Sequence, residues 1–137
     1  MRRLIPVVTL ALIAVGCGGG NGTGGVVGGQ GSVTFLQVQA SVFTPNCAIT
    51  GCHVGSGAPF GLDLSEGQAF GNIVGVPSSE LPAFDRIDPF NAADSYLFMK
   101  VSGDPRILGD PMPALGVPLS SQKQSLLEDW ITEGANP

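Results

Sequence analysis

The clearest pattern of apolar residues lies near the end of the chain. Leu126, Leu127, Trp130 and Ile131 recur with helical spacing, which predicts a helix that starts at the serines at 120 and 121 and ends at Gly134. An apolar stripe on a helix usually packs against a core. We therefore expect Trp130 to be a core residue, with contact to a ligand as the alternative.

Residues 33–43 form a second patterned segment that fits two kinds of structure. Its apolar residues at 35, 36, 42 and 43 can share one face of a helix, whereas residues 36, 38, 40 and 42 alternate as in a strand. We favour the helix. Pro45 is expected to end it and to begin the loop that carries two cysteines.

Between these segments the chain is rich in glycine and proline, so short helices and irregular crossings are expected. Ser65 predicts the N-cap of a short helix that runs to about Val74 and is weakened by two glycines. Prolines at 77, 82 and 89 predict an irregular connection. Asn91 followed by Asp94 predicts the start of another helix, with residues 96, 97 and 101 buried and Gly103 at its end.

The first sixteen residues have the pattern of a bacterial secretion signal. Arg2 and Arg3 precede an apolar run that is too short to span a membrane comfortably, and small residues lead up to Cys17. Residues 13–17 resemble a lipobox, which predicts cleavage before Cys17 and lipidation of its thiol. The alternative is an ordinary signal peptide whose cysteine is incidental.

The 137-residue chain is thus predicted to contain a signal peptide (1–16), a lipidated cysteine with a glycine-rich tether (17–32), and one small domain (33–137). Removal of the signal leaves four basic residues against eleven acidic ones, a formal net charge of −7. This charge argues against nucleic acid as a partner. No charged residue lies between Arg3 and Asp63, so the cysteine region is uncharged.

Cys47 and Cys52 are followed directly by His53, the single histidine of the chain. Two thiols can add across the vinyl groups of a haem to form thioethers, and a histidine next to the second is placed to bind the iron. The usual spacing is C-x-x-C-H, whereas this chain has C-x4-C-H, which lengthens the loop between the thioethers. In an oxidising envelope compartment, the pair is expected to be a haem attachment, a disulfide or a metal site.

A haem iron that is bound by His53 needs a second axial ligand, and the domain offers Met99 and Met112. Met99 lies in a predicted helix, where packing is its expected role. Met112 lies between Pro111 and Pro113, which stiffen the loop and lower the entropy that is lost when the sulfur binds. We therefore predict Met112 as the distal ligand, which would favour reduced iron and raise its reduction potential.

These residues resemble those of small bacterial cell-envelope cytochromes c, including monohaem lipoprotein domains, over nearly all of residues 33–137. The pieces that carry the resemblance are Phe43-Thr44-Pro45-Asn46-Cys47, Cys52-His53, Gly61-Leu62-Asp63-Leu64-Ser65, Ser95-Tyr96-Leu97 with Lys100, Met112-Pro113, Leu119-Ser120, Trp130-Ile131 and Gly134-Ala135. The resemblance implies an all-α, cytochrome c-like domain around one haem, with long irregular loops. It also implies covalent haem c on Cys47 and Cys52, with His53 and Met112 as the iron ligands. The four-residue gap between the cysteines departs from the family.

The leading hypothesis is a lipid-anchored electron carrier that serves redox protein partners and faces the periplasm or the cell surface. The alternative is a haem-free binding or structural lipoprotein in which Cys47 and Cys52 form a disulfide. Zinc is a third possibility, but two thiolates and one imidazole leave it one ligand short. No enzymatic activity is expected, because the chain has no second histidine for acid-base chemistry and its acids show no evident pairing.

Overall fold

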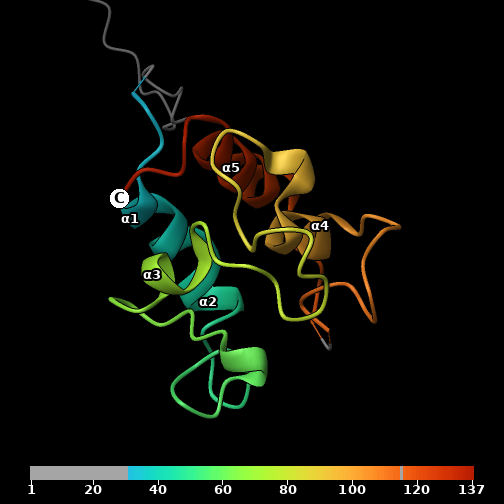
Figure 1. Cartoon of the computed structure of the whole chain (residues 1–137). Coiled ribbons are helices and arrows are strands. Elements are labelled where there is room, and N and C mark those ends of the chain that lie inside the picture. The colour runs from blue at the N-terminus through green and yellow to red at the C-terminus, as the bar shows by residue number, and fades with distance from the viewer. Residues whose placement is uncertain (1–30, 115) are drawn as a thin grey trace, which may run out of the picture.

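Short helices and long irregular loops make up the fold (Figure 1). The structure is a computed structural model that describes residues 31–114 and 116–137. The predicted signal peptide, the lipidation site Cys17 and nearly all of the tether lie outside these residues. The described part of the chain contains two isolated β-bridges and no strand. The prediction of a small helical fold is confirmed, and its relation to cytochromes c stays a prediction.

The first helical run comprises α1 (Phe35–Val38), a π-helical segment η1 (Gln39–Phe43) and α2 (Thr44–Asn46). The Thr34 hydroxyl accepts a hydrogen bond from the Gln37 N–H, and the Gln37 side chain accepts one from the Thr34 N–H. This reciprocal capping box satisfies two backbone donors that a helix start leaves unpaired. The helical interpretation of residues 33–43 is therefore confirmed over the strand.

Pro45 does not end this run as predicted, because it lies inside the last turn. A proline at this place removes the N–H that would bond to the Ser41 carbonyl four residues earlier. The Asn46 side-chain amide replaces the missing donor, since its Nδ2 lies 2.6 Å from the Val42 oxygen and 3.4 Å from the Ser41 oxygen. The helix consequently ends at Asn46, and the cysteine loop begins with the next residue.

The helix that was predicted from Ser65 to Val74 is shorter, because α3 spans only Ala69–Ile73. Ser65 is not its N-cap. The Ser65 carbonyl accepts from the N–H groups of Gln68 and Ala69 in a preceding turn. Gly67 has φ +78°, a left-handed conformation that interrupts a right-handed helical path. The glycine therefore delays the helix by about one turn.

The helix that was predicted from Asn91 to Gly103 is split into a 3-10 turn, η3 (Ala92–Asp94), and α4 (Tyr96–Ser102). Ser95 between them is extended and fully buried. Its hydroxyl donates to the Asn91 carbonyl over 2.9 Å, which fixes the break. Gly103 ends α4 with φ +73°, as predicted.

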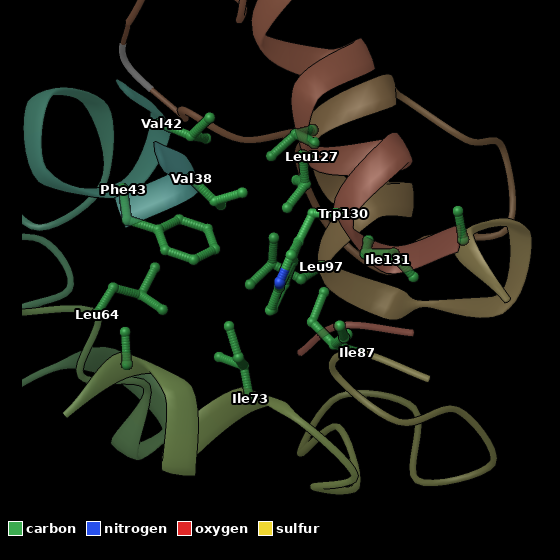
Figure 2. Packing of buried hydrophobic residues seen from close by; sticks show 14 of the residues in the cluster. Val38, Val42, Phe43, Leu64, Ile73, Ile87, Leu97, Leu127, Trp130 and Ile131 are labelled. Atoms are coloured by element: carbon green, nitrogen blue, oxygen red, sulfur yellow. The ribbon is translucent and has the colours of Figure 1, made fainter. Parts of the chain in front are cut away.

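Helix α5 (Ser121–Thr132) forms where the apolar stripe predicted it, with Ser120 as N-cap and Gly134 in a left-handed conformation after its end. Trp130 is fully buried, which confirms its predicted core role. Figure 2 shows its indole pointing from α5 into the centre of the core. The core side chains labelled there are Val38, Val42, Phe43, Leu64, Ile73, Ile87, Leu97, Leu127, Trp130 and Ile131.

Helix α5 joins the two ends of the domain. The centroid of the Trp130 rings lies 5.4 Å from that of Phe35 in α1 and 6.4 Å from that of Phe70 in α3. The Glu133 carboxylate accepts from the Val33 N–H over 2.6 Å, and the last residues run beside the start of α1 (Figure 1). The core is thus closed by contacts between the first and the last helix.

Asn46→Asp should lower the free energy of unfolding by about 1–2 kcal/mol, because it removes the donor that replaces the Pro45 N–H. The aspartate keeps an oxygen for the bond that Lys123 donates to the Asn46 side chain. Urea unfolding followed by Trp130 fluorescence measures the change, with the exposed Ser125→Ala as control. An unchanged unfolding midpoint would contradict the account of Pro45.

Candidate functional site

An apolar cleft lies beside the core and contains most of the chemistry that the sequence predicts. The volume inside the cleft is about 120 Å³, and further space opens to solvent. This volume is below the range of about 300–1,000 Å³ that is common for ligand and cofactor pockets. The wall is formed by the cysteine loop with the 3-10 turn η2 (Pro59–Gly61), by residues 78–86, by α4 and by Met112. The lining residues are Cys47, His53, Pro59, Phe60, Leu62, Leu64, Ser78, Ser79, Glu80, Arg86, Tyr96, Leu97, Lys100, Val101 and Met112.

The cleft brings together three of the four predicted haem residues. Cys47, His53 and Met112 line it, although Met112 is far from the other two in sequence. Cys52 does not line it and is exposed. Met99 is also absent from the lining and is buried in the core to 1% exposure. Met99 is thus a packing residue, as predicted, whereas the role of Met112 as an iron ligand stays a prediction.

The His53 ring is oriented by its own backbone neighbourhood. Its Nδ1 lies 3.1 Å from the Leu62 carbonyl oxygen. A carbonyl can only accept, so Nδ1 carries the proton and Nε2 keeps its lone pair. The His53 N–H donates to the Cys47 carbonyl, and the His53 carbonyl accepts from the Leu64 N–H. The histidine is thus fixed in a tautomer that can bind a metal through Nε2.

The surroundings of His53 favour its neutral form. Burial lowers the pKa of the imidazole, the hydrogen bond to Leu62 opposes this effect, and the positive charge of Arg86 adds to it. Protonated imidazole cannot bind a metal. A lowered pKa therefore favours the neutral ring that can bind a metal.

The two thiols of the cysteine loop differ in their surroundings. Burial raises the pKa of the Cys47 thiol to about 11, with a further rise from Cys52 and an opposing effect of Lys123. Cys47 is half-buried in the cleft wall, whereas Cys52 faces solvent, and both thiols are free. Since the thiolate is the nucleophile, the Cys47 sulfur is chemically quiet in this state.

Charged and polar groups in the cleft wall were not predicted from the sequence. Glu80 and Lys100 form an ion pair of 3.0 Å, and the side chain of Lys100 is only 9% exposed. Arg86 donates to the carbonyl oxygens of Asn72 and Phe60 over 2.8 and 2.7 Å. Lys100 appeared in the sequence only as part of the motif after Tyr96. Glu80 and Arg86 gave no local signal, because their partners are distant in the chain.

No protein-family model, curated protein or solved structure matches this chain. Within residues 31–114 and 116–137, no three His, Cys, Asp or Glu side chains gather in a group that could hold a metal ion. The same residues include no helix that is long and apolar enough to cross a membrane. The site is therefore interpreted from its own geometry.

Iodoacetamide at pH 8 should modify Cys52 long before Cys47 in the protein without haem. With a pKa of about 11, only about one Cys47 thiol in a thousand is ionised at that pH. Tandem mass spectrometry of the peptide that contains both cysteines locates the label at successive times. Denaturation in urea should abolish the difference. Equal rates in the folded protein would show that Cys47 is not shielded in the cleft wall.

Acidification from pH 7.5 to pH 5 should destabilise the haem-free protein through His53. Its folded-state pKa lies below the ordinary value of 6.5, so the unfolded chain binds the proton first and stability is lost as the pH falls through this range. The lowered pKa values of Asp63, Asp94 and Asp104 place their titration at lower pH. Thermal unfolding of the wild type and of His53→Asn measures the effect, and the variant should lose this pH dependence. If the stability of the wild type and of His53→Asn changed equally with pH, His53 would not be the cause of the loss of stability.

Proposed function

We propose that this chain is a lipid-anchored monohaem c-type cytochrome that carries single electrons between redox proteins of the bacterial cell envelope. The observation that carries the proposal is the meeting of Cys47, His53 and Met112 in one apolar cleft. A thiol, a neutral imidazole and a thioether are the groups needed for covalent attachment and six-coordinate iron.

The residues of the cleft fit a haem in three respects. Its lining is mostly apolar, as in pockets that bind cofactors. The His53 tautomer leaves Nε2 free to coordinate iron. The soft sulfur of Met112 is a ligand that haem iron accepts. These properties come from separate segments of the chain, so their coincidence supports the proposal.

Each residue has a defined task in this function. The Cys47 sulfur would hold the haem through a thioether bond. His53 would bind the iron through Nε2, and Met112 would bind it through its sulfur. The haem would supply one-electron exchange between its ferrous and ferric states. The positive charge of Arg86 lowers the pKa of His53. The same charge disfavours additional positive charge in the cleft, so it would favour the reduced, ferrous iron.

Cys52 needs a change of direction before it can form the second thioether, because it faces solvent outside the cleft. Residues 48–51 provide the extra chain length for this movement. Gly51 has φ +84°, a conformation that glycine adopts more easily than other residues. The C-x4-C-H spacing thus has a physical role in the proposal. It lets Cys52 turn inward while His53 keeps its bond to Leu62.

A haem-free lipoprotein with a Cys47–Cys52 disulfide is the second candidate function. Its support is that both cysteines of one short loop are free thiols. A disulfide here would close a short loop beside the cleft. The cleft would then bind an apolar ligand without covalent attachment, a function in which Met112 has no necessary part.

Expression in cells that mature cytochromes c should give a coloured protein whose haem survives a denaturing gel. Cys47→Ala/Cys52→Ala should leave no haem on the gel, and each single variant shows which thioether forms. Haem staining and the visible spectrum provide the measurement. A colourless wild type that migrates as a disulfide form on non-reducing gels would favour the second candidate.

Met112→Ala should lower the reduction potential of the haem protein and remove the weak near-infrared sulfur-to-iron band of its ferric form. The matched control is Met99→Leu, which keeps the volume of a buried core residue and should cost less than about 1.5 kcal/mol of stability. Potentiometric titration with near-infrared spectra measures both quantities. Loss of the band in Met99→Leu alone would reassign the ligand.

A further inference from the structure

Two side chains of α4 bind the backbone of Leu108, in the loop that leads to Met112. The Tyr96 hydroxyl accepts from the Leu108 N–H over 3.1 Å, and the Lys100 ammonium donates to the Leu108 carbonyl over 2.6 Å. Tyr96 and Lys100 are four residues apart, so they lie on the same face of the helix. Both are buried. The backbone donor and acceptor of Leu108 are thus bound by adjacent turns of α4.

Lys100 also holds Met112 itself. The Met112 N–H donates to the Lys100 backbone carbonyl over 2.8 Å. The segment 108–112 is therefore tied at both of its ends to α4, once through side chains and once through the backbone. Met112 lines the cleft from the second of these attachment points.

Hydrophobic packing does not hold this segment. Residues 108–111 are all exposed, and the Leu108 side chain is 49% exposed. A loop without buried side chains takes its position from its hydrogen bonds, since nothing else distinguishes one placement from another. The bonds to Tyr96 and Lys100 are therefore the main restraint on residues 108–111.

Glu80 makes the buried position of Lys100 stable. Its carboxylate lies 3.0 Å from the Lys100 ammonium, and the two side chains are 22% and 9% exposed. A buried ammonium without such a partner would be strongly disfavoured. Glu80 comes from residues 78–86, which form another part of the cleft wall. The ion pair consequently joins that wall to the Met112 loop through α4.

We propose that Glu80, Tyr96 and Lys100 form a clamp that positions Met112 over the iron. This role rests on the proposed haem function, and within it these three are positioning residues that do not touch the metal. A methionine sulfur is a weak neutral ligand that solvent or an added base can replace. By holding residues 108–112 on α4, the clamp keeps the Met112 sulfur at the axial position.

Lys100→Met tests the clamp in the haem-loaded full chain, because it keeps the stem but removes the donors and the charge. The measurements are the near-infrared sulfur-to-iron band and the affinity of the ferric protein for added imidazole. Apparent affinity rises in proportion to the fraction of molecules whose axial position is open, so a rise from about 1% to 10% open gives about a tenfold stronger apparent affinity. The band should weaken to match.

Three further variants sharpen the test. Lys100→Arg keeps a cation and donors, so it should recover most of the band. Tyr96→Phe removes only the hydroxyl that accepts from Leu108 and should give a smaller rise in affinity. Lys123→Met removes an equal charge from a lysine that bonds to Asn46 beside Cys47, and it should leave the band unchanged.

The outcomes separate this inference from the haem proposal. A wild type without haem overturns both. A haem-loaded wild type with the band, together with Lys100→Met and Tyr96→Phe proteins of unchanged band and imidazole affinity, overturns the clamp alone. If Lys100→Met does not fold, Tyr96→Phe and Glu80→Gln decide the matter by the same two measurements. An equal effect of Lys123→Met would assign the change to net charge and also overturn the clamp.

Discussion

Burial of Trp130 against Phe35 and Phe70 is the interaction on which the rest of this fold depends. The chain has one tryptophan and many glycines, and the indole is the largest side chain in its core. Its position in α5 brings together α1 and α3, while Nε1 donates to the Asn136 carbonyl over 2.8 Å. This core does not use the cleft residues Cys47 or Met112 as its centre.

Local sequence signals predicted both terminal helices, because capping residues and apolar spacing act within a few residues of one another. The predicted helix boundaries are wrong where a single residue overrides the pattern of its neighbours. Asn46 supplies the donor that Pro45 lacks, so the first helix continues, and Gly67 takes a left-handed conformation that shortens α3. Ser95 uses its hydroxyl to break a helix that its neighbours would continue. Each of these effects depends on a side chain or backbone geometry that periodicity does not describe.

Candidate site residues could be predicted from the sequence where they belong to short motifs. The cysteine loop with His53 and the proline-flanked Met112 could be selected from residue types, and the structure places Cys47, His53 and Met112 in the wall of one cleft. The exposure of Cys52 was not predictable, since the direction of a loop is set by contacts elsewhere. The hydrogen bonds between Leu108 and α4 could not be predicted from the sequence either. On Leu108 they involve backbone groups, which look the same in every sequence.

The bond between Val33 and Glu133 joins residues that are 100 positions apart in the sequence. A chain is synthesised from its N-terminal end, so residues 47–53 are made well before α5. Until α5 forms, Phe35 has no tryptophan to cover it and the core cannot close. The cysteine loop therefore lies outside a closed core until the last helix docks. Contact between the two chain ends thus makes closure of the core depend on the completed chain.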